Sequence, residues 1–231
     1  MASCYTEWKV LPHRPILEHT ERLWTVEGVM ESGTKRIMSV IRLEDGRVLL
    51  HNAIALDDVE MARIDALGEV AGILVPNAFH RMDCRIMQAR YPKAKVYAPA
   101  GAAKAVAKAT PVHGSYADAP QDATVRVAHL PGIKDREGVV EVRGPTGSSL
   151  VFNDMLMNIP VAGFPMDLFV GPSGRLSIPR FARWWFTSDA QALRKEIERL
   201  ADALPARIVP GHGEILTGDV SGRLRGAASL L

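Results

Sequence analysis

Short apolar stretches near the start of the chain have the pattern of β-strands. Three of them, Leu23 to Val29, Arg36 to Leu43 and Val48 to His51, are rich in Val, Ile, Leu and Trp. The segment Glu44 to Gly46 between the last two predicts a hairpin turn, because its glycine can take a positive φ. We therefore expect the first half of the chain to open with β-strands, two of them joined as a hairpin.

The hydrophobic period then changes to that of helices alternating with strands. Asp57 or Asp58 can cap a helix that ends at Gly68, and the all-apolar run Ala71 to Val75 is typical of a strand buried on both faces. The same alternation continues with a helix to about Arg90, a strand at Lys95 to Ala98 and a helix at Ala100 to Lys108. This order predicts parallel crossover units.

The second half repeats the mixture of hairpin strands and helices. Its predicted strands are Thr124 to Leu130, Gly138 to Val142, Ser149 to Phe152 and Ala206 to Val209. Ser188 and Gln191 form a capping box for a helix whose apolar stripe is Leu193, Ile197, Leu200 and Leu204. Hairpins and crossovers in both halves indicate an α/β (α+β) layered sandwich with helices outside.

The segment Met155 to Trp185 breaks this periodicity. It is rich in Pro, Gly and aromatic residues, and long loops of this kind usually cover a site, form an interface or are disordered. Its apolar content disfavours disorder. We therefore predict that residues 155–185 are an insertion that acts as a lid over a pocket or docks on a second subunit of a homodimer.

Composition places the chain among ordinary globular proteins. Its 231 residues predict one domain, 1–231, in which 1–22 form an N-terminal extension. A net charge of +2 with both signs interspersed gives no reason to expect nucleic acid or a membrane as partner, so the expected partner is a small-molecule substrate or ligand. Cys4 and Cys84 have no metal or disulfide spacing, and the first residues carry no secretory pattern, so we expect free thiols and a cytoplasmic protein.

Three polar clusters follow predicted core strands, where ligands gather in α/β layers. They are Asn77 to Asp83, Asn153 with Asp154, and Gly211 to Glu214. Imidazole and carboxylate are suitable ligands for zinc or iron, and a catalytic site needs three or four of them around an open position. His80, Asp83, Asp154 and His212 meet that number, so we predict that these four side chains converge on a metal ion.

The order of these pieces resembles the metallo-β-lactamase superfamily, with its four-layer αβ/βα sandwich. The resemblance covers roughly Leu23 to Leu216 and is carried by Ile41 to Gly46, Ile73 to Val75, Pro131-Gly132, Phe152 to Asp154 and Pro210 to Glu214. It implies metal-assisted hydrolysis, in which one or two ions lower the pKa of a water molecule and polarise the scissile bond. Asp83, Asp154 and His212 are then the residues that we assign to catalysis.

The first loop departs from the pattern of that superfamily, in which it carries His-x-His-x-Asp-His. In register, those four positions are Asn77, Phe79, Arg81 and Met82, and Ile133 stands where a His follows Pro-Gly. None of these side chains is a good ligand, and Arg81 brings a positive charge. The sequence therefore predicts that the usual two-ion centre cannot form, so that the site is degenerate and holds one zinc or iron ion or none.

Three functions remain open at this point. The leading interpretation is a metal-dependent hydrolase of an unknown ester, thioester, amide or phosphodiester. The alternative is a non-catalytic domain that has lost its metals and binds a ligand or a partner protein. A third alternative is a metal-free hydrolase with Asp83 or His80 as general base, although no GxSxG-like nucleophile motif supports it.

Overall fold

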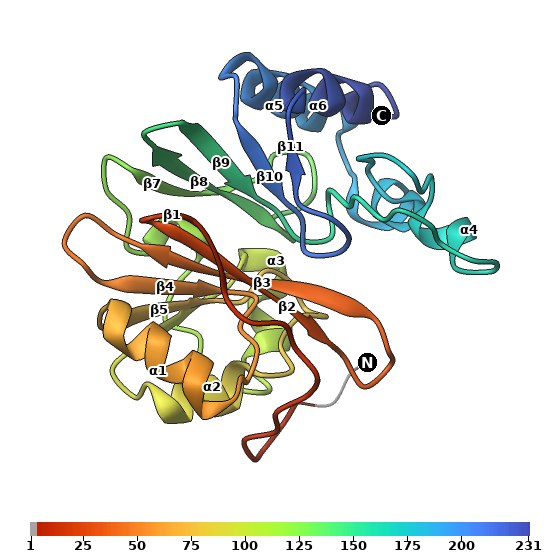
Figure 1. Ribbon diagram of the computed structural model, residues 1–231. Helices are drawn as coiled ribbons and strands as arrows, with labels where there is room; N and C mark the ends of the chain where they lie inside the picture. Colours follow the sequence, from red (N-terminus) through yellow and green to blue (C-terminus); the bar gives the residue numbers. More distant parts are fainter. Residues whose placement is uncertain (1–3) are drawn as a thin grey trace.

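Two β-sheets packed face to face form the centre of the computed structural model, which describes residues 4–231 (Figure 1). The first sheet has the order β1-β2-β3-β4-β5-β6, and the second has the order β11-β10-β9-β8-β7. The first contains β1 (Leu17–Thr20), β2 (Leu23–Val29), β3 (Lys35–Arg42), β4 (Val48–His51), β5 (Val70–Leu74) and β6 (Lys95–Tyr97). The second contains β7 (Val125–His129), β8 (Gly138–Gly144), β9 (Gly147–Val151), β10 (Arg207–Val209) and β11 (Leu216–Thr217).

Each half of the chain combines hairpins with parallel crossovers, as the pattern predicted. Strands β1 to β4 pair antiparallel, whereas β4, β5 and β6 pair parallel. In the second sheet β7, β8 and β9 are antiparallel, and β10 returns parallel to β9. The parallel strands β5, β9 and β10 are the ones after which the polar clusters follow.

Helices cover the outer face of each sheet. The helices α1 (Asp58–Leu67), α2 (Cys84–Arg90) and α3 (Ala100–Val106) pack on the first sheet through Met61, Met87 and Ala102, among others. The helices α5 (Ala190–Asp202) and α6 (Val220–Ala228) pack on the second. A third apolar cluster, with Ile41 and Val140, lies between the sheets. The layers are therefore helix, sheet, sheet and helix, which is the predicted four-layer sandwich.

Two details of α5 differ from the expectation. The cap is Asp189, whose side chain accepts from the Ala192 N–H at 3.0 Å, while Ser188 Oγ donates to the Gly132 carbonyl. Leu193, Ile197 and Leu200 are buried as predicted, but Leu204 is 73% exposed. Leu204 lies beyond the end of the helix with φ 50°, so it no longer shares the apolar stripe.

The segment 155–185 leaves the second sheet and extends beyond the sandwich (Figure 1). It contains the short helix α4 (Asp167–Val170) and a π-helical turn, Ala182–Phe186, and a β-bridge joins Met157 to Ser177 near its ends. Its exposed apolar side chains are Val161, Phe164, Met166, Leu168, Phe169, Trp184 and Trp185. The backbone N–H of Asn158 donates to the His212 carbonyl at 3.3 Å, and an isolated bridge pairs Asn158 with Gly213, so the segment begins beside the third polar cluster.

The remaining predictions concern the cysteines and the ends of the chain. Cys4 and Cys84 are free thiols, as expected. Within residues 4–231, no helix has the length and apolar character that crossing a membrane requires. Of the proposed extension 1–22, residues 1–3 lie outside the described residues. Its second half contains β1 and an isolated β-bridge between His13 and Gly28.

Candidate metal centre

The loops after β5, β9 and β10 meet at one end of the two sheets. The backbone N–H of Ile37, in β3, donates to the carbonyl of Gly211 at 2.9 Å and so ties the first sheet to the loop after β10. A Cβ at Gly211 would lie 2.3 Å from Asn153 Oδ1, and one at Gly213 would lie 2.1 Å from the Asn158 carbonyl. Glycine is needed on both sides of His212 because the neighbouring loop approaches the backbone this closely.

Three buried side chains converge where these loops meet: His80, Asp154 and His212. The two Nε2 atoms of His80 and His212 are 3.1 Å apart. Asp154 Oδ1 lies 3.2 Å from His80 Nε2 and 3.3 Å from His212 Nε2. The three donor atoms therefore form a nearly equilateral triangle.

This triangle has the size that a tetrahedral ion requires. With metal–donor bonds of about 2.0–2.1 Å, neighbouring donors in a tetrahedral site lie about 3.3 Å apart. Asp154 Oδ1 is buried and has no hydrogen-bond partner among residues 4–231. Three donors at this spacing, with one oxygen left unsatisfied, fit a single ion with an open fourth position.

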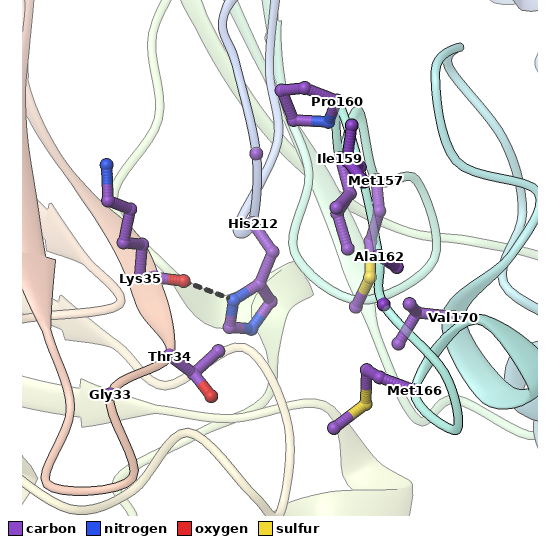
Figure 2. A pocket seen from close by; sticks show the side chains of 13 residues that line it. Gly33, Thr34, Lys35, Met157, Ile159, Pro160, Ala162, Met166, Val170 and His212 are labelled. Carbon is purple, nitrogen blue, oxygen red and sulfur yellow. Dashed lines mark hydrogen bonds between the residues drawn. The ribbon is translucent and has the colours of Figure 1, made fainter.

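Hydrogen bonds on the far side of each imidazole set its tautomer. His212 Nδ1 lies 2.6 Å from the carbonyl of Lys35, a bond drawn in Figure 2, and His80 Nδ1 lies 3.0 Å from Asn52 Oδ1. The Asn52 amide is oriented by its Nδ2, which donates to the Ile37 carbonyl at 2.9 Å. Because both Nδ1 atoms donate, both neutral rings turn a bare Nε2 toward the cluster, which is the arrangement that metal-binding histidines use.

Asn77 holds the other two members of the cluster in place. Its Oδ1 accepts from the backbone N–H groups of Phe79 and His80, at 2.8 and 3.2 Å, in a turn that brings His80 inward. Its Nδ2 donates to Asp154 Oδ2 at 2.8 Å and to Glu137 Oε2 at 3.2 Å. The loop thus uses Asn77 to position the site rather than to bind an ion.

Glu137, directly before β8, fixes the loop that carries Asp154. This fully buried carboxylate accepts from the backbone N–H groups of Asn153, Asp154 and Met155 at 2.9–3.1 Å. Within residues 4–231, neither Glu137 nor Asp154 forms an ion pair with a lysine or arginine. Asp154 is thus a buried carboxylate without a guanidinium or ammonium partner, which favours a bound cation.

The pKa shifts follow from this crowding. Burial raises the pKa of Glu137 to about 8, with the Asp154 charge adding to it against the N–H donors. Burial would also raise the pKa of Asp154, but the two imidazoles outweigh it and hold that pKa well below its usual range. Burial lowers the pKa of His80, whereas at His212 the nearby Asp154 carboxylate and the Lys35 carbonyl overcome burial and raise the pKa. The pKa shifts of the two imidazoles are thus opposite in direction.

The structure does not bring Asp83 into this cluster, which corrects its assignment as a ligand and a catalytic residue. Asp83 Oδ2 pairs with the buried guanidinium of Arg36, and its Oδ1 accepts from the Ala55 N–H at 3.0 Å. Both oxygens are thus engaged within the first sheet. His80, which lies out of register with the superfamily motif, is the residue of this loop that reaches the cluster.

The positions expected to be poor ligands bring no metal-binding atom to the cluster. Phe79 is half exposed and stacks on Phe186 with ring centroids 6.1 Å apart, and Met82 and Ile133 are buried apolar side chains. The guanidinium of Arg81 donates to the carbonyl of Ala105. Asn52, Glu137 and the Lys35 carbonyl, in contrast, were missed, because no sequence motif marks a residue that acts through hydrogen bonds to a ligand.

Comparisons with known proteins identify the fold of the chain. No protein-family model matches the sequence, and no curated protein matches it. Solved structures do match over nearly the whole chain. The DIM-1 metallo-β-lactamase exposed to ceftazidime has a TM-score of 0.64 at 14% identity, and the alignment covers 96% of this chain and 99% of that one.

Other solved structures lead to the same fold. The metallo-β-lactamase FIM-1 from Pseudomonas aeruginosa, in its mono-zinc form, has a TM-score of 0.59 at 14% identity over 96% of this chain and 97% of that one. A metallo-β-lactamase from Hirschia baltica has a TM-score of 0.56 at 12% identity over 93% and 98%. At identities of 12–14%, the likeness to these structures concerns the fold alone. The chain has the metallo-β-lactamase fold.

Proposed function

We propose that this chain is a metal-dependent hydrolase with a single-ion site held by His80, Asp154 and His212. The observation that carries the proposal is the donor triangle, whose edges of 3.1–3.3 Å match a tetrahedral zinc site with one position open. The mono-zinc form of FIM-1, a protein of the same fold, shows that the fold can hold one ion. Zinc is the ion that this donor set favours, and iron is the alternative.

The residues around the cluster would bind and orient the substrate. A cavity of 370 Å³ opens onto His80, Asp154 and His212 and is walled by Phe79, Phe181, Trp185 and Phe186, among others. Apolar walls exclude water and strengthen the electrostatic interactions inside. A bound ion would lower the pKa of a water molecule and polarise the scissile carbonyl or phosphoryl group. Asn52, Asn77 and Glu137 keep the three ligands in position.

One ion per chain is the expected content. The first-loop positions that carry ligands of the two-ion centre in the superfamily are Asn77, Phe79, Arg81 and Met82, and Asn77 is already bonded to Asp154 and Glu137. Within residues 4–231, no other group of three metal-binding side chains accompanies the cluster.

Elemental analysis of the purified chain, and again after zinc loading and dialysis, tests the proposal. We expect one zinc or iron ion per chain, lost in His212→Ala and in Asp154→Asn. His113→Ala is the matched control, because His113 is exposed and lies outside the cluster. The loaded chain should hydrolyse a simple ester such as 4-nitrophenyl acetate, and the two cluster variants should not.

The non-catalytic interpretation makes the opposite prediction. A stably folded chain that takes up no ion at neutral pH, or that retains its ion in His212→Ala, would refute the hydrolase. The first of these results would favour a domain that uses the same fold to bind a ligand or a partner.

A further inference from the structure

A second cavity lies on the other side of His212. It measures 480 Å³ and lies between the β2–β3 turn, at Gly33 to Lys35, and the segment 155–185 (Figure 2). This volume is within the range of about 300–1,000 Å³ that is usual for small-molecule sites. Thr34, Met157 and His212 line both this cavity and the one at the cluster. The two spaces are therefore neighbours that share a wall.

The lining of the second cavity is apolar. It is formed mainly by Met157, Ile159, Val161, Ala162, Met166 and Val170. Charged groups at its edge are already engaged, because the Lys35 ammonium lies 3.1 Å from Glu27 and both ring nitrogens of His212 have partners. Unbranched Met side chains adapt to ligands of different shape. The lining of this cavity therefore favours an apolar, uncharged group.

We infer that this cavity binds the hydrocarbon chain of the substrate, so that the substrate is an ester, thioester or amide of a medium-chain acid. This inference rests on the proposed hydrolase and adds the substrate class to it. The scissile carbonyl would lie at the cluster, and the chain would pass Thr34 and Met157 into the second cavity. Eight methylene groups need about 240 Å³, at roughly the 30 Å³ that a water molecule takes in the liquid.

Binding of neutral alcohols to the metal-free chain tests the cavity without any reaction. We expect 1-octanol to bind more tightly than 1-hexanol, and 1-hexanol more tightly than 1-butanol, by up to about fourfold per methylene group in titration calorimetry. Octanol binding should also show a negative heat-capacity change, since apolar surface leaves water. An affinity that does not depend on chain length would overturn the inference.

Variants that fill the cavity locate the bound chain. Ala162→Trp and Val170→Trp should each weaken octanol binding at least tenfold. Leu168→Trp is the matched control, because Leu168 lies in the same short helix as Val170 but is exposed and does not line the cavity. Thermal melts confirm that each variant folds. Equal weakening in all three variants would place the alcohol on the exposed apolar surface and refute the inference.

Ester hydrolysis by the zinc-loaded chain then separates the two proposals. The ratio kcat/KM should be at least tenfold higher for 4-nitrophenyl octanoate than for the acetate, a preference that Leu168→Trp keeps and Ala162→Trp loses. Octanol binding without hydrolysis would refute the hydrolase and leave the cavity assignment standing. Hydrolysis that shows no preference between the two esters would refute the chain site and leave the hydrolase standing.

Discussion

Two buried aspartates follow strand ends of this sandwich, and their surroundings are opposite. Asp83 meets the guanidinium of Arg36 and a backbone N–H, so its charge is neutralised inside the first sheet. Asp154 meets two imidazoles and an amide, and its Oδ1 has no hydrogen-bond partner among the described residues. Burial is thus a poor sign of a ligand; the informative sign is a buried carboxylate that lacks a permanent counter-charge.

The largest expected effect concerns the stability of the fold at Asp83. Asp83→Ala leaves the Arg36 guanidinium buried and unpaired, which costs about 3–5 kcal/mol of unfolding free energy. Urea unfolding of the metal-free chain measures this. Asp202→Ala is the control, because it removes an exposed ion pair with Arg225, worth less than about 1 kcal/mol. If Asp83→Ala lowered the unfolding free energy by less than about 1 kcal/mol, Asp83 would not be needed to neutralise Arg36, and the contrast with Asp154 would be wrong.

The reverse result is expected at Asp154, where the effect falls on metal affinity. Asp154→Asn takes away one of three ligands, so zinc affinity should fall at least about 100-fold in a chelator competition. The metal-free variant should also lose some unfolding free energy at neutral pH, because the two imidazoles hold the pKa of Asp154 well below its usual range and the ionised carboxylate therefore stabilises the folded state. Asp83→Ala, where it stays folded, should keep its zinc affinity within about threefold. Loss of zinc in Asp83→Ala alone would contradict the assignment.

Asn52 belongs to the surroundings of Asp154 and not to those of Asp83, because it orients the His80 ring. Asn52→Leu removes the acceptor for His80 Nδ1, and the loss of such a supporting bond typically lowers metal affinity 10–100-fold. Asn158→Leu is a comparison variant, since its side chain bonds the Glu214 carbonyl on the exposed side of the same region. Unchanged zinc affinity in Asn52→Leu would show that the ring orientation does not depend on this bond.

The smallest effect expected is a dependence of zinc binding on pH. Any proton on His212 Nε2 must leave before an ion binds there, and the pKa of His212 lies above its ordinary value. Zinc affinity should therefore fall by about tenfold per pH unit as the pH drops below that pKa. Proton release during zinc titration in two buffers of different ionisation enthalpy measures the same event. A zinc affinity that does not change between pH 8 and pH 6 would contradict this prediction.

The layers of the fold could be predicted from the sequence because they depend on local patterns. Runs such as Ala71 to Val75 and the capped stripe from Leu193 to Leu200 carry their own period, and the structure has β5 and α5 there. The strand-end argument also selected His80, Asp154 and His212, since parallel strands deliver their following loops to one edge.

The neighbours of those residues could not be predicted in the same way. Arg36, on β3, is 47 residues from Asp83, and nothing in the sequence shows that the two form a pair. Glu137 follows Lys134 to Arg136 and looks like part of a solvated charged turn, yet it is fully buried. Such pairings depend on how the two sheets dock, and no local pattern encodes that.

The separation of the three donors along the chain has a consequence for folding kinetics. His80 and His212 are 132 residues apart and come from different sheets, joined at this edge by the Ile37–Gly211 hydrogen bond. Contacts of such long range form late, because closing the intervening chain costs entropy before the contact returns any stability. An ion that needs both imidazoles would then leave the folding rate unchanged and slow the unfolding rate. Its site would form after the transition state in folding, and it would have to break before the two sheets separate in unfolding.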